Sequence, residues 1–153
     1  MDLGLWTLDF SPMIKRIAHI AVAVRSVDEA SRFFEQVLGL HRERTEVVET
    51  ERAKVAFFPV GGTEIELVEG IERGNPLEKF LEKRGEGIHH ICLEVANLDE
   101  TMGKLRQAGV PLLDETPRPG ADGTRVAFIH PKGAHGILIE LVEGPALNHA
   151  SEP

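Results

Sequence analysis

The chain has 153 residues, of which 42% are hydrophobic and 27% charged, with a formal net charge of -8. This length suits one domain of ordinary size, or two small halves that share a core. The acidic charge argues against a nucleic-acid partner, because phosphates demand a concentrated basic surface. We find no membrane span, signal peptide or disulfide, the only cysteine being Cys92, and we expect a cytoplasmic protein.

The first half of the chain reads as a strand, a helix and three strands. Alternating, β-branched residues from Arg16 predict the first strand. Ser26 and Glu29 have the spacing of a helix capping box, and Gly39 sits where a left-handed residue ends a helix. Three short strands should follow near residues 40–46, 55–60 and 64–69. The residues expected on the apolar helix face are Ala30, Phe33, Phe34, Val37 and Leu38.

A second series of elements follows after a connecting helix. Asn75 and Pro76 should open that helix, which runs to about residue 83, and residues 84–87 form a linker. Asn97 and Glu100 repeat the capping-box spacing. Weaker strand signals occur near residues 110–114, 125–130 and 136–142.

The two halves are an internal repeat. The sequence IELVEG occurs at residues 65–70 and again at 139–144, and RIAHIAVAV from Arg16 lies over GIHHICLEV from Gly87. We therefore predict one domain over 1–153 that contains a repeat of residues 16–70 and 87–143. Tails at 1–12 and 145–153 flank it.

The alternation of side chains along a strand predicts which polar residues share a face. His19 shares its face with Ala21, whereas the bulkier Val22 and Val24 take the face that the helix should cover. Three further polar residues fall on the uncovered face by the same test: Glu66, His90 and Glu140.

A metal ion would explain why two related halves each carry a histidine and a glutamate on this face. Two buried carboxylates repel each other and lose solvation unless a positive charge compensates them. Two imidazoles with two carboxylates suit a first-row ion better than magnesium or calcium. One such residue alone is more often a core histidine or an exposed glutamate, but the repetition favours the set of four. We expect cobalt, with manganese, nickel, zinc and iron as alternatives.

These segments resemble the vicinal oxygen chelate superfamily and, within it, the methylmalonyl-CoA epimerases. The matching segments are RIAHIAVAV, VGGTEIELVEG, NPLEKFLEKRGEGIHHICLEV and RVAFIHPKGAHGILIELVE. The resemblance implies an α+β fold in which two βαβββ modules form an incomplete mixed β-barrel around one metal, and a homodimer. It implies epimerisation of methylmalonyl-CoA at carbon 2. The implied metal ligands are His19, Glu66, His90 and Glu140, the second of which is glutamine in some members.

Epimerisation requires removal of a proton next to a thioester and its return to the opposite face. A metal at the thioester oxygen would act as a Lewis acid, and two carboxylates are the simplest pair of bases. The resemblance makes Glu140 one of them. Some members carry the second base in the strand that corresponds to residues 52–58, where gapless alignment places Val55. Glu51 has the same parity as Val55 and is our candidate.

CoA carries several negative charges, so basic residues should line the mouth of its cavity. The candidates near the end of the second half are Arg118, Arg125 and Lys132. A glyoxalase I-type lyase remains an alternative enzyme, since it uses the same ligand types. A metal-free binding protein of the same fold is an alternative from another class.

Overall fold

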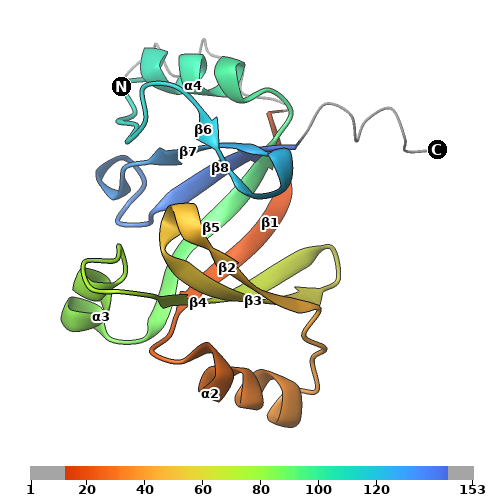
Figure 1. Cartoon of the computed structure of the whole chain (residues 1–153). Coiled ribbons are helices and arrows are strands. Elements are labelled where there is room, and N and C mark those ends of the chain that lie inside the picture. The colour runs from red at the N-terminus through yellow and green to blue at the C-terminus, as the bar shows by residue number, and fades with distance from the viewer. Residues whose placement is uncertain (1–12, 145–153) are drawn as a thin grey trace. The chain divides into compact units, whose positions relative to one another are not determined.

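The computed structural model describes residues 13–144, so both predicted tails lie outside the described residues. Two compact units are present, one of residues 18–91 and the other of the segments before and after it. β1 (Ile14–Ala23) and β5 (Gly87–Val95) contribute residues to both units (Figure 1). Within the described range no helix is long and apolar enough to span a membrane.

The unit of residues 18–91 follows the predicted order of strand, helix and three strands. After β1 come α2 (Val27–Arg32), β2 (Arg44–Val48), β3 (Ala53–Val60) and β4 (Thr63–Gly70), and α3 (Glu78–Arg84) follows. β2, β3 and β4 pair antiparallel, whereas β4 pairs parallel with β1. The parallel pair places the first strand of the module beside its last.

The start of α2 is the predicted cap, but the end of this helix differs from the prediction. Ser26 Oγ accepts a hydrogen bond from the Glu29 amide at 3.1 Å. A π-helical turn, η1 (Phe33–Val37), then replaces the regular helix. The wider turn changes the angular spacing of side chains, so Ala30 and Phe34 reach the core while the rest of the predicted face does not. Phe33, Val37 and Leu38 are 51%, 70% and 51% exposed.

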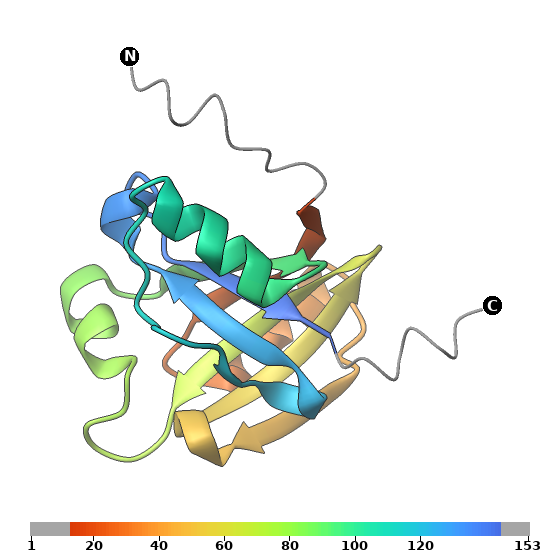
Figure 2. The same ribbon diagram turned by 90° about the horizontal axis from the view of Figure 1, so that it is seen from above.

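The second unit also contains a helix packed on strands. α4 (Leu98–Gln107) begins at the predicted cap, where Asn97 Oδ1 accepts from the Glu100 amide at 2.9 Å. Figure 2 shows α4 lying across β7 (Arg125–Ile129) and β8 (Ile139–Glu143). β6 is only Arg118–Pro119, and it pairs with β7, which pairs with β8.

The strand predicted at residues 110–114 is wrong. Leu112 alone makes a bridge, to Ile129 on β7. Pro111 has no amide hydrogen to donate, and the Asp114 carboxylate accepts the Phe128 amide at 2.8 Å in place of a backbone carbonyl. The segment therefore follows the edge of β7 without forming a ladder.

The predicted division of faces is confirmed within each unit. Val22 and Val24 pack in the cluster under α2, together with Leu67. Val95 and Leu141 pack in the cluster under α4. The candidate ligands have the opposite parity on the same strands, so they lie on the faces that the helices leave uncovered.

The last glutamate of each IELVEG copy holds the start of a helix. Glu69 Oε1 accepts the Val27 amide at 2.7 Å, and Glu143 Oε1 accepts the Leu98 amide at 2.8 Å. Both amides are the first of their helix, where a carboxylate also meets the positive end of the helix dipole. Each copy of the repeated sequence therefore supplies both a candidate metal ligand and a glutamate that anchors a helix.

Candidate metal centre and active site

Three candidate ligands meet in the unit of residues 18–91. His19 Nδ1 lies 2.8 Å from Glu66 Oε2, and His19 Nε2 lies 3.2 Å from His90 Nε2. The parallel register of β1 and β4 pairs Ala21 with Glu66, so His19 and Glu66 are close on one face. The repeat predicted these three residues as one group, and the fold brings them together.

The chemistry of this cluster fits a divalent cation. Imidazole nitrogens and a carboxylate oxygen are the donors that first-row ions bind in proteins. The side chains of His19 and Glu66 are only 17% and 16% exposed, so solvent screens them poorly. Glu66 and His90 contact different nitrogens of the His19 ring, so a cation bound by His19 and His90 would replace the contact between their Nε2 atoms, with Glu66 on the Nδ1 side of His19.

His89 supports His90 from the same strand. The Nδ1 atoms of the two rings lie 2.9 Å apart. The ring of Phe80, from α3, meets His89 edge-on with 4.9 Å between the ring centroids. The doubled histidine thus links the cluster to α3 and restricts the orientation of His90.

Glu64 is a second acidic group on this face, after Glu66, and sequence reasoning left it without a role. It has the same parity as Glu66, and it lies opposite His19 in the β1–β4 register. Its Oε2 atom is buried and has no hydrogen-bond partner among residues 13–144. Burial raises the pKa of Glu64 above its ordinary value of 4.5, and repulsion from Glu66 adds to that rise. The alternating acids of TEIELVE were the signal that could have identified it.

Glu140 lies in the other unit, on β8, and it is 8% exposed. Its cross-strand neighbour is Phe128, just as the neighbour of Glu66 is Phe57. In each unit an arginine covers that ring: Arg44 lies 3.8 Å above the centroid of Phe57, and Arg118 lies 5.0 Å above that of Phe128. These matching surroundings agree with the register of the repeat. That Glu140 completes the metal site stays a prediction.

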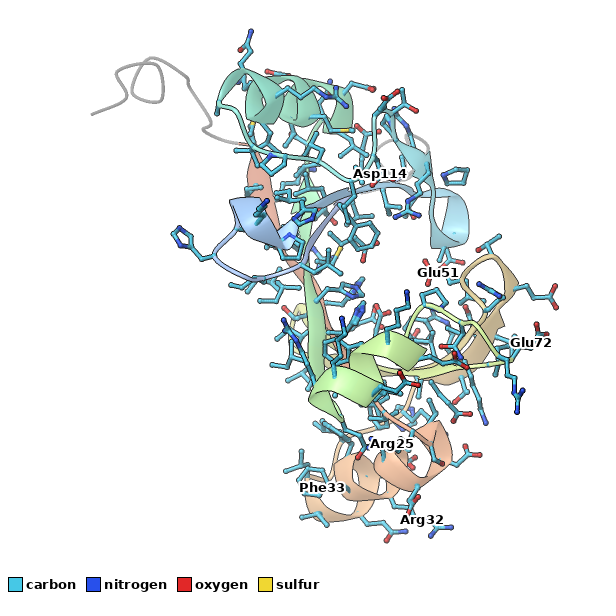
Figure 3. All side chains as sticks on the ribbon, turned by 90° about the vertical axis from the view of Figure 1, so that its left-hand side faces the viewer. Arg25, Arg32, Phe33, Glu51, Glu72 and Asp114 are labelled. Atoms are coloured by element: carbon cyan, nitrogen blue, oxygen red, sulfur yellow. The ribbon has the colours of Figure 1, made fainter. Side chains whose placement is uncertain are left out.

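Glu51 ends a short 3-10 turn, η2 (Glu49–Glu51), between β2 and β3. The parity argument does not apply there, since the residue is not in a strand. Val55, where gapless alignment places the second base, is 3% exposed in a small apolar cluster. Figure 3 shows Glu51 at this turn. Its role as the second base stays a prediction.

The three basic residues predicted to meet CoA differ in their surroundings. Arg125 pairs with Asp99 at 2.8 Å and with Glu143 at 3.0 Å, and the hydrogen bond to Asp99 raises the pKa of Arg125. Arg118 pairs with Asp114 at 3.0 Å. Lys132 is exposed in the turn η4 (Pro131–Gly133) and has no carboxylate partner among the described residues. Arg125 is thus occupied in fastening α4, whereas Lys132 is available to a ligand.

Residues 18–128 match the family model of the glyoxalase/bleomycin resistance protein/dioxygenase superfamily. The chain is 36% identical over 131 residues to an ethylmalonyl-CoA/methylmalonyl-CoA epimerase of Cereibacter sphaeroides, which covers 84% of this chain and 98% of that protein. It is 34% identical over 127 residues to the mitochondrial methylmalonyl-CoA epimerase of Homo sapiens, covering 82% of this chain and 72% of the human protein.

Solved structures give the same likeness. The methylmalonyl-CoA epimerase of Mycobacterium tuberculosis superposes with a TM-score of 0.83 at 32% identity, covering 95% of this chain and 98% of that one. A methylmalonyl-CoA epimerase in complex with methylmalonyl-CoA and NH4+ gives 0.80 at 34% identity, covering 87% and 96%. The α+β fold predicted from the sequence is therefore confirmed.

Proposed function

Because the chain belongs to the glyoxalase/bleomycin resistance protein/dioxygenase superfamily, we propose that it is an isomerase that epimerises methylmalonyl-CoA at carbon 2. The observation that carries this proposal is the cluster of His19, Glu66 and His90 on one uncovered sheet face. Named epimerases at 34–36% identity support the choice of substrate.

We propose His19, Glu66 and His90 as metal ligands, with Glu140 as the fourth. Cobalt remains our first choice of metal, with manganese, nickel, zinc and iron as alternatives. When bound, a divalent cation supplies Lewis acidity that stabilises negative charge on the thioester oxygen. Glu64 adds a second carboxyl group to the same face, and a cation there would relieve the repulsion between Glu64 and Glu66 that an imidazole cluster alone leaves in place.

Two carboxylates then move the proton. One carboxylate takes the proton from carbon 2, and the electron pair of the C–H bond passes into the thioester carbonyl. The other, which starts as the protonated carboxylic acid, delivers its proton to the opposite face of carbon 2, which restores the carbonyl with inverted configuration. We assign these roles to Glu140 and Glu51. Neither group needs an oxidant or a reductant, since the reaction leaves the substrate composition unchanged.

The remaining assignments follow from the same proposal. We propose that Lys132 and Arg118 bind the phosphates of CoA. Arg125 is the weaker candidate for this role, because its guanidinium already pairs with Asp99. The protein is proposed to act as a homodimer in the cytoplasm. Lys132→Gln should raise KM for the CoA substrate and leave kcat unchanged.

Deuterium incorporation at carbon 2 tests the proposed function. Wild-type protein reconstituted with cobalt should exchange the carbon 2 hydrogen of methylmalonyl-CoA with deuterium oxide, and Glu140→Gln should do so far more slowly. The glutathione hemithioacetal of methylglyoxal serves as the competing substrate. Turnover of that compound, with no exchange in methylmalonyl-CoA, would assign the site to a glyoxalase I-type lyase instead.

A further inference from the structure

Side chains of the unit of residues 18–91 form a continuous series of contacts through the candidate ligands. Glu66 Oε2 lies 2.8 Å from His19 Nδ1, and His19 Nε2 lies 3.2 Å from His90 Nε2. At the other nitrogen of that ring, His90 Nδ1 lies 2.9 Å from His89 Nδ1. Each contact between two imidazoles needs one nitrogen that carries a hydrogen and one that does not. The hydrogens of the three rings therefore depend on one another.

The carboxylate at one end of this series sets the position of every hydrogen in it. A carboxylate only accepts, so a neutral His19 carries its hydrogen on Nδ1 and leaves Nε2 as an acceptor. His90 must then donate from Nε2, and its own Nδ1 accepts the hydrogen of His89 Nδ1. In the metal-free protein, His90 thus holds its hydrogen on the nitrogen that a cation would need.

A bound cation requires the opposite tautomer of His90. A cation that replaces the contact between the two Nε2 atoms needs the lone pair of each. The hydrogen of His90 must then be on Nδ1, where His89 Nδ1 accepts it, and the hydrogen of His89 must be on Nε2. Each ring stays neutral, because the proton that His90 loses from Nε2 is balanced by the one that His89 gains at Nε2. His89 therefore has to change tautomer together with His90.

We propose that His89 is a positioning residue that sets the tautomer of His90 and so raises the affinity of this site for a divalent cation. This inference rests on the metal site of the proposed function. Phe80, on α3, holds the His89 ring edge-on with 4.9 Å between the ring centroids. The next residue of the same parity is Ile91, so an apolar side chain would serve packing alone at this position. The imidazole adds an acceptor for His90, as ligand histidines commonly require.

Nitrogen NMR of the imidazoles tests the two tautomers directly. In metal-free protein, His89 should carry its hydrogen on Nδ1 and His90 on Nε2. Zinc, which is diamagnetic, should move these hydrogens to His89 Nε2 and His90 Nδ1. A zinc-bound protein in which His89 keeps its hydrogen on Nδ1 would overturn the inference.

Cobalt titration of metal-free variants measures the consequence for affinity. His89→Phe keeps a ring against Phe80 but has no nitrogen, and it should weaken cobalt binding roughly 10–100-fold. His89→Asn should restore most of that loss, because its amide oxygen can accept where Nδ1 does. His41→Leu changes an exposed histidine outside the series and should bind cobalt as the wild type does.

The same titration separates failure of the inference from failure of the proposed function. Equal cobalt affinity of His89→Phe and the wild type overturns the inference and leaves the metal site standing. Wild-type protein that binds neither cobalt nor zinc refutes the proposed metal site itself. If His89→Phe does not fold, His89→Leu takes its place, with the same expected loss and the same rescue by His89→Asn.

Discussion

The two modules of the chain attach their helix to their strands through the same kinds of contact. In each, the last glutamate of IELVEG accepts the first amide of the helix, and a basic residue bonds the aspartate next in that helix: Lys54 with Asp28 and Arg125 with Asp99. Each also stacks an arginine on the phenylalanine beside its candidate ligand. The contacts that fasten helix to sheet are therefore the ones that the repeat has kept.

The modules differ in one acidic residue near the candidate ligands, in the end of the first helix and in one turn. The first has Glu64 at the position that Leu138 occupies in the second, and its helix ends in a π-helical turn with exposed apolar side chains. It also carries the bent turn of Glu51 and Arg52. The two modules thus share the contacts that hold the helix to the sheet and differ at Glu64 and at the turn between β2 and β3.

The largest expected effect separates the two equivalent glutamates. Glu140→Gln should lower kcat about 10³-fold, since it removes a proposed base. Glu66→Gln should cost no more than about tenfold, because the resemblance includes members with glutamine there and an amide oxygen can still bind a cation. Steady-state rates and metal content, measured on both variants, check this. Equal reductions of kcat in the two variants would contradict the assignment of the base to Glu140 alone.

The two phenylalanines at the end of α2 should respond very differently. Phe34 packs on Phe58 with ring centroids 5.6 Å apart, whereas Phe33 is 51% exposed. Phe34→Ala should lower the free energy of unfolding by about 3 kcal/mol, and Phe33→Ala by less than about 1 kcal/mol. Urea unfolding of the two variants measures the difference. A reversed order would show that the π-helical turn does not orient this helix as described.

The paired helix anchors should give matching effects. Glu69→Gln and Glu143→Gln each weaken a charged hydrogen bond at a helix N-terminus, so each should cost about 1–2 kcal/mol of unfolding free energy. Glu143 also pairs with the partly exposed Arg125, and the loss of such a pair adds little to that cost. Chemical denaturation with wild-type protein as reference measures both. A large cost in one variant and none in the other would break the equivalence of the modules.

The smallest effect is a pH dependence that only the first module should have. Because the folded protein raises the pKa of Glu64 above 4.5, the folded state binds that proton more tightly than the unfolded state. Glu64 therefore favours folding at low pH, and this contribution is lost as pH rises above 4.5 through the folded pKa. In metal-free protein, Glu64→Gln should flatten the fall of stability with pH. Unfolding measured across that range, with Leu138→Gln as control, tests this.

Local signals in the sequence predicted much of this structure. The caps at Ser26 and Asn97 depend on a few neighbouring residues, and alternation assigned His19 and Glu66 to one face without long-range information. The repeat then joined His90 to them.

Other features depend on contacts that sequence spacing does not encode. A π-helical turn keeps the composition of an α-helix, so periodicity placed Val37 on the wrong face. The segment around Pro111 does not form the predicted strand, because proline has no amide hydrogen to donate to β7 and the hydrogen-bond ladder stops there. The left-handed Arg52 is fixed by a carbonyl more than twenty residues away, at Gly74, and no local pattern announces it.

The anchors formed by Glu69 and Glu143 have a consequence for how each module opens. The first amide of each helix is protected by a side chain on the last strand of its own module, and the partners are 42 residues apart in the first case and 45 in the second. Detachment of that strand would expose the amide of Val27 or Leu98 to solvent before the helix itself unwinds. These two amides are thus natural hydrogen-exchange reporters, one for β4 and one for β8.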